Sequence, residues 1–287
     1  MKILIGFNGS EAATSAVHDL RYAGLPDDTE VVLLTVAESW LPPKTVEEAI
    51  SISAAAKAAI SDEFPNWIVT AKTASGSPPR EIIALAEPFE PDLIVVGEPR
   101  QPVGEHKMFL GHTSQTLLTE AVCSIRISRG QKALESRPAK ILVGFDGSPG
   151  ATLAIDSLLA RSWRAGTEVR LLAVADSSVL TSIGRFTPQM NDTSIEARFA
   201  LQWAESLAST SLKRLKNAGL IAHVEVRLGR PKDALIAAAE NWEADAIFVG
   251  PHCSLNSFER FSIGSVSADV AARAHCSVEV VKPRGPQ

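Results

Sequence analysis

The sequence has few of the residues that build covalently linked or metal-centred folds. Its 287 residues include three cysteines, Cys123, Cys253 and Cys276, and no CxxC or HxxxH spacing. A disulfide framework and a zinc set are therefore excluded as explanations of the fold. Sparse, unpaired cysteines are typical of a reducing compartment, so we expect a cytoplasmic protein. We interpret Cys123 and Cys276 as buried packing residues without redox chemistry.

Long apolar runs and an excess of positive charge are also missing. No segment approaches the 18 or so consecutive apolar residues of a membrane span, and MKILIGF is not followed by a cleavage site, so we expect neither a membrane segment nor a signal peptide. With 28 basic and 33 acidic residues, the formal charge is −5. Binding of nucleic acid or of an anionic membrane needs a concentrated basic surface, so we expect neither partner.

What the sequence does contain is a repeat. KILIGFNGSEAATSAV starts at Lys2 and KILVGFDGSPGATLAI starts 138 residues later at Lys140, and 10 of the 16 aligned positions are identical. Further along, landmarks in the first copy recur 153 residues later, among them Gly97 with Gly250 and Gly111 with Gly264. Ordered landmarks at fixed offsets indicate a duplicated unit. We predict two domains, 1–129 and 139–287, joined by a linker over 130–138.

The two copies differ in length by one insertion. The change of offset from 138 to 153 gives the second copy 15 extra residues, which lie within 177–193 and are rich in Ser and Thr. Such a segment is either a solvated surface loop or a lid over the neighbouring crevice.

Each copy alternates short apolar runs with helical patterns. In the first copy we predict strands over 2–7, 31–36, 68–74, 92–96 and 124–128, with helices over 46–62, 79–87 and 113–121 between them. Ser10 and Ser148 are expected to cap the helix after the first strand of each copy. Alternation of this kind indicates an α/β fold with parallel strands and right-handed crossovers.

The order of the strands decides where a ligand would bind. We predict a Rossmann-like sheet of five strands in the order 3-2-1-4-5 in each copy. Ligands of such sheets bind at the carboxyl ends of the strands, where the strand order reverses. The loops of interest are therefore 6–10 with 97–113, and 144–148 with 250–266.

Three motifs resemble the universal stress protein family: KILVGFDGS at the start of a copy, VGPHC after the fourth strand and GSVSADVAARAHCSVEVV at its end. The resemblance covers nearly the whole chain twice. It implies an adenine nucleotide α-hydrolase-like fold, a role in stress response, and ATP or AMP as ligand in some members. ATP would bring Mg²⁺ with it, and a fully decayed motif would bind no cofactor.

The family's nucleotide motif is only partly present. ATP-binding members have an acidic residue after strand 1, then Gly, two residues, Gly, nine residues and Gly-Ser or Gly-Thr after strand 4. The second copy has Cys253 at the second glycine, and the first has Asn8 in place of the acid and Arg100 at the second glycine. The resemblance therefore implies nucleotide-binding residues mainly in the second copy: Asp146, Val174, Val249, Gly250, Gly264, Ser265 and Val266. The matching first-copy candidates are Asn8, Gly97, Gly111, His112 and Thr113.

Each of these residues also has a plain structural reading. Asp146 is equally a turn former, and Ser265 with Gly264 is equally a helix start. His112, His252, Arg100, Lys107 and Arg260 could contact phosphate or be ordinary surface residues. No base or metal set for efficient catalysis is visible, so the sequence leaves room for weak ATP hydrolysis at most.

Two functions remain open. The chain is either a stress-response regulator that binds an adenine nucleotide, or a nucleotide-free scaffold that acts through protein partners. An ATP pyrophosphatase would need an SGGxDS-like loop, which GFNGSEA and GFDGSPG do not supply.

The last strand of each copy points to how the copies meet. A bare final strand leaves unpaired backbone groups at the sheet edge. Members of the family pair this edge with another copy, so we expect an internal pseudo-dimer in which 124–128 pairs antiparallel with 277–281. Arg126 and Glu279 occupy equivalent positions, and their opposite charges favour pairing of the unequal halves. Whether two chains associate further is left open.

Overall fold

The computed structural model describes residues 1–99, 109–130, 137–175, 193–251 and 263–283, with the backbone alone at 175 and 193–201. We refer to residues up to 130 as the first half and to those from 137 as the second half. The insertion at 177–193 falls almost wholly on 176–192, outside the described residues. So do Arg100, Lys107, His252, Cys253 and Arg260.

The first half contains the expected alternation of strands and helices. Its elements are β1 (Lys2–Gly6), α1 (Glu11–Asp19), a short 3₁₀ helix η1 (Leu20–Tyr22), β2 (Glu30–Ala37), α2 (Val46–Glu63), β3 (Ile68–Ser75), α3 (Pro78–Phe89), β4 (Leu93–Gly97), α4 (His112–Glu120) and β5 (Ser124–Ser128).

The second half repeats this order. Its elements are β6 (Lys140–Gly144), α5 (Pro149–Leu159), β7 (Glu168–Ala175), α7 (Thr193–Asn217), β8 (Ile221–Leu228), α8 (Pro231–Trp242), β9 (Ala246–Val249), α9 (Ser265–Arg273) and β10 (Ser277–Val280). The strand expected over 277–281 thus ends one residue earlier.

The first helix of each half starts as the sequence predicts. The Ser10 hydroxyl accepts a hydrogen bond from the Ala13 N–H at 3.2 Å, and Ser148 does the same for Ala151 at 3.1 Å. Pro149 stands in the first turn of α5, where its missing N–H costs no hydrogen bond. Both helices therefore begin immediately behind the end of a buried strand.

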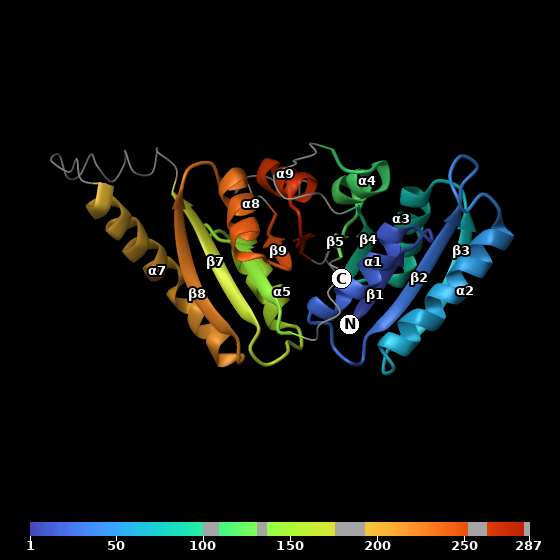
Figure 1. The fold of residues 1–287 in the computed structure, drawn as a ribbon, viewed down its shortest axis with the longest axis horizontal. Coiled ribbons are helices and arrows are strands. Elements are labelled where there is room, and N and C mark those ends of the chain that lie inside the picture. Colours follow the sequence, from blue (N-terminus) through green and yellow to red (C-terminus); the bar gives the residue numbers. More distant parts are fainter. Residues whose placement is uncertain (100–108, 131–136, 176–192, 252–262, 284–287) are drawn as a thin grey trace.

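All ten strands form one sheet, in the order β3-β2-β1-β4-β5-β10-β9-β6-β7-β8. Within each half the strands are parallel and follow the predicted order 3-2-1-4-5. The halves join where β10 pairs antiparallel with β5, with Glu279 opposite Arg126. In Figure 1 the halves lie side by side, with β3 and α2 at one end of the molecule and β8 and α7 at the other.

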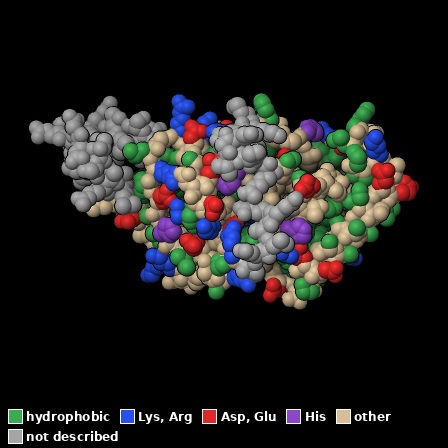
Figure 2. Space-filling model, in the orientation of Figure 1, with side chains coloured by type: hydrophobic (Ala, Val, Ile, Leu, Met, Phe, Trp, Pro, Cys, Tyr) green, Lys and Arg blue, Asp and Glu red, His purple; other side chains and the backbone are tan. Residues whose placement is uncertain are grey.

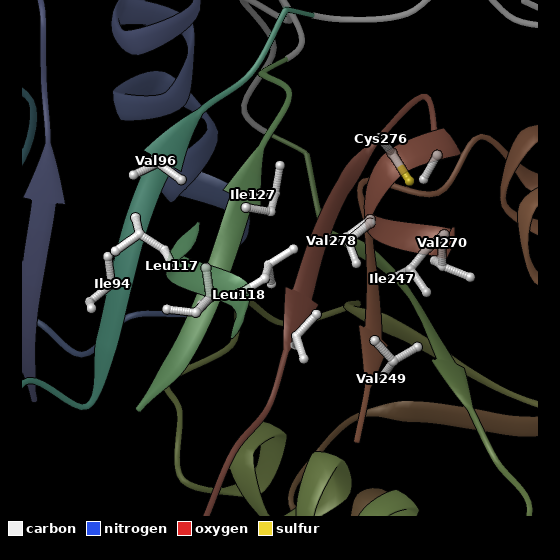
Figure 3. Close-up of a cluster of buried hydrophobic side chains, with 14 of the residues drawn as sticks. Ile94, Val96, Leu117, Leu118, Ile127, Ile247, Val249, Val270, Cys276 and Val278 are labelled. Carbon is white, nitrogen blue, oxygen red and sulfur yellow. The ribbon is translucent and has the colours of Figure 1, made fainter. Parts of the chain in front are cut away.

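Helices cover both faces of this sheet, and the two faces differ. On one face α3, α4, α8 and α9 enclose a single apolar cluster that continues across the junction. Figure 3 shows its middle, where Ile127 of the first half lies next to Val278 of the second, with Ile94 farther into the first half and Ile247 farther into the second. On the other face the apolar residues under α1 and α2 and those under α5 and α7 form separate clusters.

Between those two clusters lies a group of buried charges, the interface ion cluster: Asp19, Arg126, Arg161 and Glu279. Arg126 donates to the Asp19 carboxylate at 2.9 Å and contacts Glu279 at 3.4 Å, and Glu279 also pairs with Arg161. All four are almost fully buried. Burial opposes the charge of Arg126, but Asp19 and Glu279 outweigh it and raise the pKa of this guanidinium. The two positive and two negative charges balance, as burial requires.

Two basic residues complete the junction by capping helices of the opposite half. Arg129, just after β5, donates to the Ala271 carbonyl at the end of α9 at 2.6 Å. Lys282, its equivalent after β10, donates to the Leu118 and Ala121 carbonyls at the end of α4 at 2.8 and 2.6 Å. The last carbonyls of a helix have no partner within it, so each half supplies what the other lacks.

Cys123 and Cys276 are buried, as expected. Burial raises the pKa of Cys123 to about 11 and that of Cys276 to about 12. At neutral pH both groups are therefore thiols, the unreactive form.

We expect the native protein to expose no more than one of its three thiols to a thiol-reactive dye at pH 7.5. Cys123 and Cys276 should react only after unfolding, because both are buried and protonated. Titration with the dye in buffer and in denaturant measures this, and the denatured protein, with three reacting thiols, is the control. Two or more fast-reacting thiols in the native state would contradict the buried assignment.

A second prediction concerns the contribution of the interface ion cluster to the stability of the fold. Replacing Glu279 with Gln leaves Arg126 and Arg161 facing a single carboxylate, and breaking a buried pair costs about 3–5 kcal/mol. We expect Glu279→Gln to lower the free energy of unfolding by roughly that amount in urea titrations. The matched control is Glu225→Gln, because Glu225 also lies between two arginines, Arg170 and Arg227, but on a partly exposed surface.

The control should cost no more than about 1 kcal/mol. Equal losses for the two variants would show that the charges at the junction contribute no more than surface ion pairs do.

Candidate functional site

Each half has a crevice where its strand order reverses. In the first half β1 lies between β2 and β4, so the chain leaves β1 and β4 toward opposite faces of the sheet. In the second half β6 lies in the same way between β7 and β9. Loops that leave such a pair of strands in opposite directions open a space between them, and this space is where doubly wound folds bind ligands.

In the first half this space is a cavity of about 920 Å³. Its walls include apolar side chains from β2, α3 and β4, such as Val36, Ile82 and Val96. All five first-half candidates predicted from the sequence line it: Asn8, Gly97, Gly111, His112 and Thr113. Its volume is within the range of small-molecule sites.

The start of α4 in this crevice is occupied by a side chain of the protein. Glu98 follows β4 directly, and its carboxylate accepts hydrogen bonds from the Gly111 N–H at 3.1 Å and the Ser114 hydroxyl at 2.5 Å. Burial lowers the pKa of Arg129, and the negative charge of Glu98 partly opposes that shift. The anion that a helix start attracts is thus supplied by Glu98 itself.

The second half differs at this point. Pro251 stands 153 residues after Glu98, so no carboxylate is available at that position. Ser267, the equivalent of Ser114, donates instead to the Gly250 carbonyl at 3.0 Å. Gly264 is the N-cap of α9 and provides no side-chain hydrogen bond to the helix. Among the described residues, none is seen to cap the first N–H groups of α9 with a side chain.

The other second-half candidates lie around this helix start. Asp146 is exposed two residues after β6, and its carboxylate accepts the Ser148 N–H at 2.9 Å, which makes it a turn former. Ser265 is the exposed first residue of α9. Val249 ends β9, while Val174 and Val266 pack against the same apolar cluster that contains it.

Two of the glycines have a packing reason to be glycine. A Cβ on Gly250 would lie 2.0 Å from the Gly150 carbonyl oxygen, and one on Gly97 would lie 2.4 Å from that of Ala12. The first turn of α5 therefore touches the end of β9, and the first turn of α1 touches the end of β4. Close approach of backbone to backbone requires glycine there whether or not a ligand binds.

These contacts bring the starts of α5 and α9 to the end of β9. The first turn of α5 touches Gly250, and the Gly250 carbonyl binds Ser267 in the first turn of α9. Two helix starts therefore meet at one point behind the ends of β6 and β9, and each presents N–H groups and a positive dipole end there.

In the part of the chain that the structure describes, no group of three or more His, Cys, Asp and Glu side chains could hold a metal ion. Within the same ranges, no helix is long and apolar enough to cross a membrane. On the face in Figure 2, basic and acidic side chains are both scattered across the surface.

Several residues that are important in the structure belong to none of the motifs in the sequence. Glu98 could have been noticed as an acid directly after a strand end, in a loop already under consideration. Asp19, Arg129, Arg161 and Lys282 gave no such signal, because each finds its partner more than 100 residues away in the sequence.

Comparison with known proteins gives the same picture of two similar units. The model of the universal stress protein family matches twice, over residues 1–129 and 139–282. Universal stress proteins of Staphylococcus aureus are 32% identical over 145 residues, which covers 50% of this chain and 82% of theirs.

Solved structures share the whole fold. A universal stress protein from Archaeoglobus fulgidus superposes with a TM-score of 0.65 at 20% identity, covering 99% of this chain and 98% of that one. A family protein from Arabidopsis thaliana, solved with AMP bound, covers 47% of this chain and 97% of its own at 18% identity and a TM-score of 0.32, too low to support an argument about ligands. The chain therefore belongs to the universal stress protein family and contains two domains of that family.

Proposed function

We propose that this chain is a cytoplasmic stress-response regulator that binds an adenine nucleotide, AMP or ATP, in its second half. The observation that supports this most is the start of α9. It lies behind β9 at the point where the strand order reverses, its N-cap is Gly264, and the carboxylate that fills the corresponding place in the first half is replaced by Pro251.

The residues there suit the parts of a nucleotide. The backbone N–H groups of Gly264 and Ser265, with the Ser265 hydroxyl, would donate to phosphate oxygens at the positive end of α9. Asp146, exposed after β6, would accept hydrogen bonds from ribose hydroxyls or an adenine amine. Val174 and Val266 offer an apolar surface for the base. Binding rather than turnover is proposed, since the described residues contain no arrangement of base and nucleophile.

Calorimetry with AMP and ATP on the purified chain tests the proposal. We expect one nucleotide per chain, and we expect Ser265→Ala and Asp146→Asn each to weaken binding about tenfold or more. Hydrogen bonds to charged groups contribute about 1.5–3 kcal/mol, and 1.4 kcal/mol is a factor of ten. Asp146→Asn introduces the residue found at the equivalent first-half position and keeps an acceptor for the Ser148 N–H, so the turn should persist.

Two exposed first-half positions serve as controls. Asp28→Asn and Ser51→Ala make the same chemical changes away from both crevices and should leave the affinity unchanged. Absence of heat and of any thermal shift at millimolar nucleotide would reject the proposal.

A second candidate is a nucleotide-free scaffold that acts through protein partners. Two observations favour it: Cys253 replaces the family's second glycine, and Glu98 fills the phosphate position of the first half. The scaffold is the function that remains if the wild-type chain binds neither AMP nor ATP.

A further inference from the structure

The first-half cavity is larger than a purely structural packing defect and is built differently from its second-half counterpart. It is about 920 Å³ in volume and is lined by strand ends and helix starts at the point where the sheet order reverses. The charge and polarity of its lining side chains determine which class of ligand it can bind.

Glu98 is held in place by contacts on three sides. Its backbone N–H donates to the Ser128 carbonyl at 2.9 Å, and its carboxylate accepts hydrogen bonds from Gly111 and Ser114. A Cβ on Gly111 would lie 2.8 Å from the nearer carboxylate oxygen, so glycine is what allows the carboxylate to approach the helix start. The carboxylate is a fixed part of the cavity wall.

A phosphate group at this helix start would compete with Glu98. Both would need the Gly111 N–H, and two negative groups at contact distance repel each other. The charges of the wall act in the same direction. Besides Glu98, the described lining residues include the carboxylate of Glu38 and, among those same residues, no Lys or Arg.

The rest of the wall remains suited to an organic ligand. Apolar surface is provided by Val36, Leu41, Ile82 and Val96. Asn8 is the first-half equivalent of Asp146 and forms the same turn, in which its side-chain oxygen accepts a hydrogen bond from the Ser10 N–H at 3.1 Å. Pockets with apolar walls and a few convergent polar groups are typical of small-molecule sites.

We propose that the first-half cavity binds a phosphate-free nucleoside, with the Glu98 carboxylate taking the place that a phosphate would occupy. The nucleoside class rests on the proposed function of the second half, which shares the fold. The exclusion of phosphate rests on Glu98 alone. One chain would then have two unequal sites, one for a nucleotide and one for an uncharged relative of it.

The test isolates the first half within the full chain. In the double variant Asp146→Ala, Ser265→Ala, which removes the second-half side chains proposed to hold the ribose and the phosphate, calorimetry with adenosine and with AMP reports on the first-half cavity. We expect adenosine to bind with a stoichiometry of one per chain and AMP to bind at least tenfold more weakly. Adding Glu98→Ala should free the α4 donors and reverse this preference by at least tenfold.

A second substitution guards against misfolding. Glu98→Gln removes the charge but keeps an acceptor for the Gly111 N–H, and it should strengthen AMP binding by several fold without loss of thermal stability. The proposal is overturned if neither ligand binds the double variant at millimolar concentration, if AMP and adenosine bind it equally well, or if both Glu98 variants leave the preference unchanged.

These outcomes are separate from those of the second half. Failure of the proposed nucleotide site appears as loss of AMP binding by the wild-type chain, whereas failure of this inference appears as loss of adenosine binding by the double variant.

Discussion

The antiparallel pairing of β5 with β10 is the contact on which the rest of the molecule depends. It joins two five-stranded sheets into one and removes two exposed edges at once. It also brings Arg126 opposite Glu279 in the interior, where an unpaired charge would be very costly. Asp19 balances Arg126 within the first half and Arg161 balances Glu279 within the second, so the pairing of the two strands brings two neutral ion pairs together.

The same contact organises the polar groups around it. Arg129 and Lys282 each reach into the opposite half to cap a helix that ends there, α9 and α4 respectively. The N-terminal ends of α4 and α9 lie at the two crevices. Their C-terminal ends are held at the junction. The crevices and the packing at the junction are therefore connected through nine-residue helices that are held at their far ends.

Much of this fold could be read from the sequence, because it depends on local patterns and on the repeat. Alternating apolar runs fixed the order of strands and helices, Ser10 and Ser148 marked helix starts, and the offset of 153 placed Arg126 opposite Glu279. The crevices were located in the same way. What could not be read were contacts between residues distant in sequence, such as Arg161 with Glu279 and Arg129 with the end of α9. No local pattern specifies which charge meets which.

In the candidate site, too, some features could be predicted from the sequence and others could not. Gly97 and Gly250 were selected for a nucleotide motif, yet each lies against the backbone of the first helix of its half, and packing alone accounts for them. Glycines at such motif positions are therefore evidence for the fold and not, by themselves, evidence for a ligand. The difference between Glu98 and Pro251 is more informative, because the common fold does not require either residue.

The opposite charges at the junction also bear on the history of the chain. A protein descended from a self-pairing ancestor can return to a single copy only while its contact surface still matches itself. Once one half has Arg126 and the other Glu279, two identical first halves would bring arginine against arginine and two second halves glutamate against glutamate. Opposite charges at this position therefore favour the pairing of unlike halves over the pairing of like ones.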